Sequence, residues 1–84
     1  MRTVIWFVYL VEGRGQLYCG ITTDVKRRVN EHNNSKCGSK WCRAHRPVKL
    51  VWNEEVIDKS AALKRECEIK KMSAAEKRKL IKEK

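Results

Sequence analysis

The sequence lacks the features that would place it in a membrane or outside the cell. Its apolar runs are far shorter than the ~20 residues that a membrane-spanning helix needs. The apolar opening MRTVIWFVYLV is not followed by the small-residue cleavage site of a signal peptide. We therefore expect a cytoplasmic protein with no membrane partner, whose four cysteines are free thiols in a reducing compartment.

Acidic residues are scarce relative to basic ones. The 84 residues include 20 Lys and Arg but only 10 Asp and Glu, which gives a formal net charge of +10 at pH 7. This excess favours nucleic acid as a partner, with simple solubility as the alternative explanation. Internal repeats and low-complexity linkers are also missing, so residues 1–84 are expected to form a single domain.

Two β-rich runs open the sequence and predict a hairpin. WFVYLV and LYCGI are separated by EGRGQ, a glycine-containing break that is typical of a turn between antiparallel strands. With Gly13–Arg14 as a two-residue turn of type II′, Tyr9 pairs directly with Tyr18. Directly opposed residues project from the same face of a sheet, so both tyrosines are predicted on one face.

The segment TTDVKRRVNEH predicts a helix that is capped by Thr22 or Thr23 and runs to about Asn33. Val25 and Val29, which are one helical turn apart, define its inward face.

Two basic residues of this helix lie beside its inward face. At about 100° per residue, Arg28 and His32 fall within roughly 60° of Val25, whereas Arg27 points to solvent. An arginine held against the sheet needs an anionic partner because its guanidinium cannot lose its charge. The two adjacent arginines are therefore predicted to have different roles.

A loop and a third strand follow this helix. Residues 34–47 are polar, basic and contain a glycine, which predicts a loop. In residues 48–56, the apolar side chains of Val48, Leu50 and Trp52 alternate along the chain, so they are predicted on one face of a strand.

A second helix, which begins at residues 58–60, is predicted to bury a carboxylate. Its apolar side carries Ala62, Leu63 and Ile69, and Glu66 lies in the middle of that side. A carboxylate on an apolar helix face must pair, protonate or bind a metal. The purely structural interpretation is a buried salt bridge between Glu66 and the inward arginine of the first helix.

A capping box of Ser73 and Glu76 predicts the start of a third helix. The predicted fold class is thus α/β (α+β): a small three-stranded antiparallel sheet flanked by helices, in the order β-β-α-β-α-α.

These residues, taken in order, resemble the GIY-YIG endonuclease domain, most of all its small stand-alone bacterial members. The family's two motifs correspond to Val8-Tyr9-Leu10 and Tyr18-Cys19-Gly20, with apolar replacements at three positions. Arg28 matches the family's phosphate-facing arginine, and Glu66, in LKRECEIKK, matches its metal-binding glutamate. The resemblance covers nearly the whole chain, from Trp6 to about Leu80.

The resemblance implies a metal-dependent endonuclease that hydrolyses nucleic-acid phosphodiester bonds, with DNA favoured over RNA. Glu66 would hold one Mg²⁺ or Mn²⁺, and Arg28 would bind the phosphate. Tyr9 would activate the attacking water as general base, with Tyr18 positioning the water or the phosphate. His32, which matches the family's histidine, would orient a neighbour or shuttle a proton; the structural alternative is a hydrogen bond at the edge of the core.

Further residues are expected to contact nucleic acid. They are the solvent-facing Arg27 and the loop residues Lys40, Trp41 and Arg43. Trp41 could stack on an unpaired base. Larger family members carry separate DNA-recognition domains, so a partner protein is a possible source of substrate specificity here.

Two other functions are compatible with the sequence. One is a non-catalytic nucleic-acid-binding module of the same fold, because a supporting asparagine found late in some larger family members has no counterpart here. The other is a zinc site with ligands from Cys37, Cys42, His45 and either His32 or Cys67. The stretch CGSKWC contains no CxxC pair, the spacing that is typical of such sites.

Overall fold

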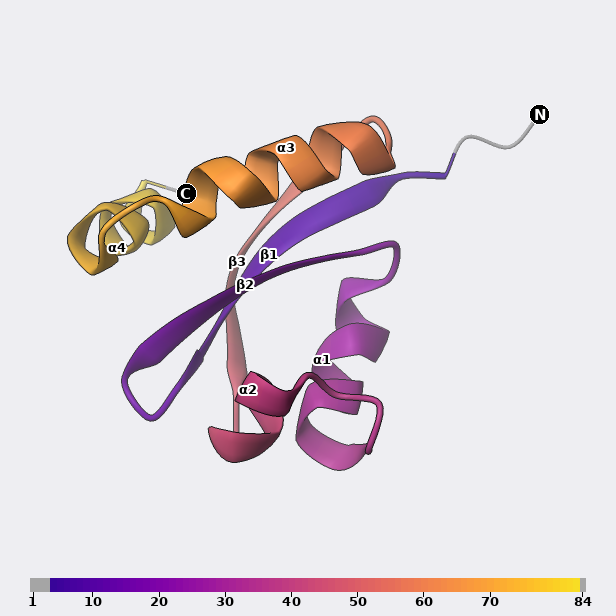
Figure 1. Cartoon of the computed structure of the whole chain (residues 1–84), viewed down its shortest axis with the longest axis vertical. Coiled ribbons are helices and arrows are strands. Elements are labelled where there is room, and N and C mark those ends of the chain that lie inside the picture. The colour runs from indigo at the N-terminus through magenta and orange to yellow at the C-terminus, as the bar shows by residue number, and fades with distance from the viewer. Residues whose placement is uncertain (1–3, 84) are drawn as a thin grey trace.

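The computed structural model describes residues 4–83, and they form a three-stranded sheet with helices on both sides (Figure 1). The elements, in chain order, are β1 (Trp6–Gly13), β2 (Gln16–Thr22), α1 (Val25–Asn34), α2 (Lys40–Ala44), β3 (Lys49–Val56), α3 (Lys59–Lys70) and α4 (Ala74–Lys82). The strands are antiparallel in the order β2-β1-β3. The predicted α+β class and element order are confirmed, with the short helix α2 as an addition inside the predicted loop.

Each face of the sheet has its own apolar cluster because successive side chains of a strand point to opposite faces. The cluster on the α3 side consists of Val8, Leu10, Cys19, Trp52, Ala62 and Ile69. The cluster on the α1 side consists of Tyr9, Val11, Cys42 and Val48. In Figure 1, α3 and α4 lie on one side of the strands, and α1 and α2 lie on the other.

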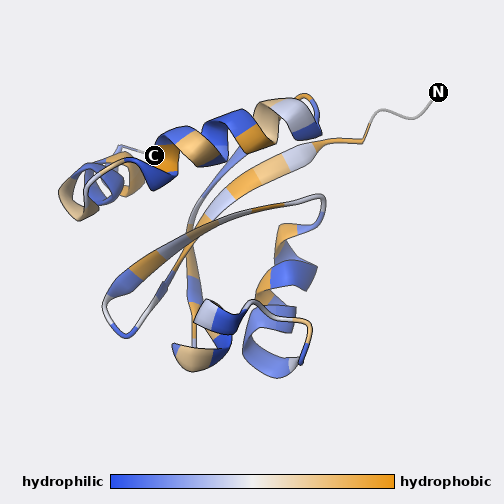
Figure 2. Ribbon diagram, in the orientation of Figure 1, coloured by the Kyte–Doolittle hydropathy of each residue, from blue (hydrophilic) through white to orange (hydrophobic). Residues whose placement is uncertain are grey.

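Hydrophobic residues concentrate along β1, the central strand, whereas the helices carry many hydrophilic residues (Figure 2). This distribution follows from burial, because β1 is covered on both faces and each helix buries only one. Within residues 4–83, we find no helix with the length and apolar character needed to cross a membrane.

The hairpin register differs from the sequence prediction by two residues. The turn is formed by Arg14 and Gly15, whose φ angles of 53° and 78° are both positive, as a type I′ turn requires. Tyr9 therefore pairs with Gly20, and the predicted direct pairing with Tyr18 is wrong. Because the register changes by an even number of residues, the two tyrosines still project from the same face.

A β-bulge in β3 corrects a second prediction. The neighbours Leu10 and Val11 pair with Trp52 and Leu50, which leaves Val51 as an extra residue on β3. The bulge directs Trp52 to the α3 side, while Leu50 remains on the α1 side. The predicted common face of the apolar residues in this strand is therefore wrong for Trp52.

The start of α1 is capped by an aspartate and not by a threonine. The side chain of Asp24 accepts a hydrogen bond from the backbone N–H of Arg27 at 3.0 Å. Thr22 contributes indirectly, because its hydroxyl accepts from the backbone N–H of Asp24 at 3.1 Å. The carboxylate also suits the positive end of the helix dipole.

α3 and α4 begin where the sequence predicts. Asp58 caps α3, and Ser73 with Glu76 forms the predicted capping box of α4. Ala62 is fully buried, as expected, but Leu63 is 47% exposed and does not belong to the inward face. The packed face of α3 is narrower than the predicted one because the sheet covers a single stripe of the helix.

Candidate active site

The phenol of Tyr9 lies across a glycine of the neighbouring strand. A Cβ atom built at Gly20, the partner of Tyr9 in β2, would overlap with the phenol oxygen and Cζ. Glycine within a strand commonly marks such a close approach. Only glycine at this position therefore leaves room for the ring, which is 1% exposed.

α1 brings a histidine to this phenol. The Nε2 atom of His32 lies 2.7 Å from the hydroxyl oxygen of Tyr9. Its other ring nitrogen, Nδ1, accepts a hydrogen bond from the backbone N–H of Ser39 at 3.1 Å. His32 is fully buried, so these two contacts satisfy both of its polar atoms in the absence of solvent.

Burial determines the charge states of Tyr9 and His32. Desolvation, assisted by the charge of Arg28, lowers the pKa of His32 to about 4. Desolvation and the neighbouring Tyr18 raise the pKa of Tyr9 well above its ordinary value, although Arg28 acts in the opposite direction. Phenol and imidazole are therefore both uncharged at neutral pH.

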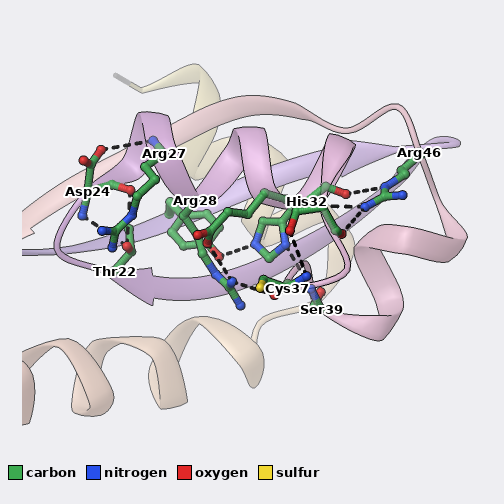
Figure 3. A network of polar contacts seen from close by, with 11 residues as sticks. Thr22, Asp24, Arg27, Arg28, His32, Cys37, Ser39 and Arg46 are labelled. Atoms are coloured by element: carbon green, nitrogen blue, oxygen red, sulfur yellow. Dashed lines mark hydrogen bonds and ion pairs between the residues drawn. The ribbon is translucent and has the colours of Figure 1, made fainter.

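Arg28 lies at the edge of this pair and is held by two acceptors. Its Nη1 donates to Oε1 of Glu31 at 3.0 Å and to the carbonyl of Cys37 at 2.9 Å (Figure 3). The predicted anionic partner is thus present, but it is Glu31 of the same helix. Arg28 is 29% exposed at its side chain, whereas Arg27 is exposed, so the predicted difference in orientation between the two arginines is confirmed.

Arg46 supports the end of α1 and was not singled out by the sequence analysis. Its Nε donates to the carbonyl of His32, and its Nη2 donates to the carbonyl of Ser35, both at 2.6 Å (Figure 3). These carbonyls belong to the end of a helix, where no further intrahelical N–H groups are available to donate to them. Because a loop and α2 lie between the end of α1 and Arg46, no local signal in the sequence links this residue to that helix end.

Tyr18 links the pair to α2. Its ring lies edge-on to His32 with centroids 6.0 Å apart, and it stacks on Trp41 at 5.3 Å. Trp41 in turn stacks on His45 at 3.9 Å. Tyr18 is half-buried, so it is more open to solvent than Tyr9. Both predicted tyrosines are therefore brought together with the predicted arginine and histidine.

The residues expected to contact nucleic acid surround this group. Lys40 and Arg43 are exposed on α2, beside the half-buried Trp41. Arg27 is exposed near the start of α1, away from Arg28 in Figure 3. These side chains add positive charge around the site without contacting its buried pair.

Glu66 lies on the other side of the sheet. Its side chain is 19% exposed, and Oε2 lies 3.5 Å from Nζ of Lys70. Burial, together with the charge of Glu66, raises the pKa of Cys19 to about 12, so the carboxylate faces this thiol. The inward orientation of Glu66 is as predicted, but the alternative of a salt bridge with Arg28 is wrong.

The two halves of the predicted site meet at β2, which is an edge strand. Tyr18 and Cys19 are consecutive in β2, so their side chains point to opposite faces. Tyr18 belongs to the α1 side, and Cys19 belongs to the α3 side, where Glu66 lies. Adjacent residues of β2 thus carry Tyr18 on one face and, on the other, the thiol that Glu66 faces.

A single carboxylate, that of Glu66, is available here for a hard cation that keeps most of its water. Mg²⁺ is commonly bound through one or two carboxylates plus substrate phosphates, with several waters retained. Glu66, which is partly exposed and paired with a surface lysine, supplies one such carboxylate. Within residues 4–83, no group of three or more His, Cys, Asp or Glu side chains is arranged to hold a metal ion. The suggested zinc ligands are therefore not assembled.

Comparisons with known proteins match one family model and several relatives. The family model described as the GIY-YIG catalytic domain matches residues 5–79. A UPF0213 protein of Desulfotalea psychrophila is 50% identical over 78 residues, which cover 92% of this chain and 71% of the relative. A UPF0213 protein of Staphylococcus epidermidis is 49% identical over 78 residues, covering 92% and 94%. The solution NMR structure of a UPF0213 protein from Bacillus halodurans has a TM-score of 0.60 and 36% identity, covering 95% of this chain and 85% of that one.

Proposed function

This chain belongs to the GIY-YIG catalytic domain family, and from that membership we propose that it is a metal-dependent nuclease acting on nucleic-acid phosphodiester bonds, DNA in preference to RNA. The observation that carries the proposal is the proximity of Tyr9 to His32 and Arg28. By resemblance, these three residues match the family's tyrosine, histidine and arginine. A purely structural core would not need an arginine beside a buried phenol.

Arg28 is the phosphate-binding residue of the proposed site. Its planar guanidinium already binds one carboxylate, that of Glu31, and a phosphate presents oxygens of similar spacing. A substrate phosphate would replace Glu31, while the carbonyl of Cys37 would keep its hydrogen bond to the arginine. The fixed charge would then stabilise the additional negative charge of the transition state.

Tyr9 is the proposed general base, and Tyr18 is proposed to position the water or the phosphate. The oxygen of Tyr9 is near the guanidinium of Arg28, which favours its ionised form, and it lies 2.7 Å from Nε2 of His32. Because Tyr9 is 1% exposed, this role requires that substrate binding bring a water to that oxygen. The raised pKa makes its base form a minor population at neutral pH.

Glu66 is the proposed ligand of one Mg²⁺ or Mn²⁺ ion, which when bound would stabilise negative charge on the scissile phosphate and on the leaving oxygen. To bind the metal, Glu66 must give up its ion pair with Lys70. This ion pair is weak because Lys70 is half exposed. The position of Glu66 across the edge of β2 suits a substrate that lies along that edge.

The surrounding basic residues are proposed to hold the substrate by its backbone. Arg27, Lys40 and Arg43 are exposed and would contact phosphates with little sequence preference, and Trp41 would meet bases. Sequence or structure selectivity would then come from a partner protein. We propose a cytoplasmic location because all four cysteines are free thiols.

A non-catalytic nucleic-acid-binding module is the second candidate. It is favoured by the closed state of the site, in which Tyr9 is shielded from solvent and Arg28 is already neutralised by Glu31. The same basic surface would bind nucleic acid in either case.

A panel of end-labelled DNA and RNA substrates separates the two candidates. It should include duplex, single-stranded, flap and branched forms, each incubated with Mg²⁺ or Mn²⁺ and, as a control, with excess EDTA. We expect metal-dependent cleavage of at least one form by the wild type and loss of cleavage in Tyr9→Phe, with binding retained. Binding without cleavage under either metal would contradict the nuclease and support the binding module.

A further inference from the structure

Two main-chain groups on either side of Gly38 contact the site. The carbonyl of Cys37 accepts a hydrogen bond from Arg28 at 2.9 Å, and the backbone N–H of Ser39 donates to Nδ1 of His32 at 3.1 Å (Figure 3). Both contacts use the backbone, so they do not depend on the side chains of the segment. One short segment thus holds the two basic side chains of the site.

Close packing against α1 makes these contacts possible. Gly38 is buried, and a Cβ atom there would lie 2.7 Å from the carbonyl oxygen of Glu31 and 2.7 Å from Cα of His32. Any other residue would therefore push the segment away from the helix. The glycine lets the flanking carbonyl and N–H approach to hydrogen-bonding distance.

We propose that residues 37–39 form a positioning clamp that fixes His32 in its Nε2–H tautomer, so that the imidazole donates a hydrogen bond to Tyr9. The proposal concerns a positioning role, and it rests on the proposed function in so far as Tyr9 is the base.

The tautomer follows from the direction of one hydrogen bond. A backbone N–H can only donate, so Nδ1 of His32 must offer Ser39 its lone pair and cannot carry a proton. The imidazole is fully buried and its pKa is lowered to about 4, so it is neutral and has one ring proton. That proton is on Nε2, which lies 2.7 Å from the oxygen of Tyr9.

The fixed tautomer distinguishes between the orienting role and the proton-shuttling role of His32. With Nε2 protonated, His32 cannot accept the proton of Tyr9, so it does not shuttle that proton. Instead it stabilises negative charge on the phenol oxygen, as a hydrogen bond to the ionised form does. The carbonyl of Cys37 likewise keeps Arg28 in place when a phosphate displaces Glu31, which preorganises the site.

Two substitutions of Ser39 isolate the N–H from the side chain. The backbone of Ser39 has φ −61° and ψ 154°, which proline adopts without strain, so Ser39→Pro removes the N–H donor in place. Ser39→Ala is the matched control, because both variants lose the hydroxyl that caps α2 at Cys42 but only the proline loses the N–H.

Long-range ¹H–¹⁵N NMR spectra of His32 report the tautomer directly. We expect the Nε2–H pattern in the wild type and in Ser39→Ala, and admixture of the Nδ1–H tautomer in Ser39→Pro. Cleavage by Ser39→Pro should fall about tenfold to a hundredfold below Ser39→Ala in kcat, with little change in KM.

An Nδ1–H pattern in the wild type, or a folded Ser39→Pro with an unchanged Nε2–H pattern, would overturn the clamp. If Ser39→Pro does not fold, the wild-type spectrum alone decides. A wild type that shows the Nε2–H pattern but cuts no substrate would support the clamp and contradict the proposed nuclease, so the two failures are distinguishable.

Discussion

At the scale of single residues, the site is constrained most by the neutral imidazole of His32, which has two arginines near it. Arg28 and Arg46 both lower the pKa of His32, and burial lowers it further than either charge does. Glu31 partly offsets them. The position therefore favours a histidine that stays uncharged, which suits hydrogen bonding to Tyr9 more than acid catalysis.

The stability of the fold should depend on pH through His32. Its pKa is about 4 in the folded chain and near 6.5 when unfolded, so between these values only the unfolded chain takes up the proton. The free energy of unfolding should therefore be unaffected above pH 6.5 and fall towards pH 4, by on the order of 3 kcal/mol from this group.

Urea unfolding at several pH values checks this expectation, with the non-titrating His32→Gln as control. The variant should lose less stability than the wild type over the same range. Parallel pH profiles of the two proteins would show that His32 is not the group responsible.

The two adjacent arginines should differ strongly in their contribution to cleavage. Arg28→Ala removes a charge-assisted contact to the reacting phosphate and should raise the barrier by about 2.7–4 kcal/mol, by analogy with loss of an oxyanion-hole donor. Arg27→Ala removes one exposed charge, so it should weaken binding and leave kcat nearly unchanged. Steady-state kinetics of both variants measure the difference, and equal losses of kcat would contradict the assignment.

At the scale of secondary-structure elements, the sequence predicted helix and strand types well and their registers poorly. The capping residues Asp58 and Ser73 mark helix starts with local signals, so α3 and α4 were found. The hairpin turn and the bulge at Val51 depend on pairing between strands, which local pattern does not specify. α2 was missed because five residues give too few turns for a periodic signal.

The candidate site shows the same division. Tyr9, Arg28 and His32 were identified by pattern and resemblance, and they do lie together. The contacts that hold them were not foreseen, because they come from main-chain groups of Cys37 and Ser39. Backbone donors and acceptors are the same in every residue, so a sequence cannot indicate which ones a site uses.

Arg46 should prove to be the residue on which the end of α1 depends. Arg46→Met leaves the carbonyls of His32 and Ser35 without their charged donor, which should lower the free energy of unfolding by about 1–3 kcal/mol. The exposed Arg43→Met is the matched control and should change stability by less than about 0.5 kcal/mol. Thermal and urea denaturation compare them, and equal effects would refute the capping role.

At the scale of the whole molecule, the net charge of +10 should dominate binding to nucleic acid. If about four basic side chains contact phosphates, affinity should fall roughly 100-fold between about 50 and about 200 mM salt. A triple alanine variant of Arg27, Lys40 and Arg43 should show a shallower salt dependence. Fluorescence anisotropy with unrelated duplexes measures both, and salt-independent or strongly sequence-selective binding would contradict a backbone contact.

The proposed function of this fold is hydrolysis of phosphodiester bonds with the help of a metal held by Glu66. The fold itself should tolerate loss of that carboxylate, because the ion pair with the half-exposed Lys70 contributes at most about 1 kcal/mol. Glu66→Gln should therefore fold with nearly wild-type stability. Glu68→Gln, on the exposed side of the same helix, is the matched control.

The most direct measurement is the Mg²⁺-dependent cleavage rate of the wild type, Glu66→Gln and Glu68→Gln on one substrate. We expect that Glu66→Gln loses metal-supported cleavage while the wild type and Glu68→Gln cut at similar rates. Cleavage by Glu66→Gln at the wild-type rate, under the same Mg²⁺, would contradict it.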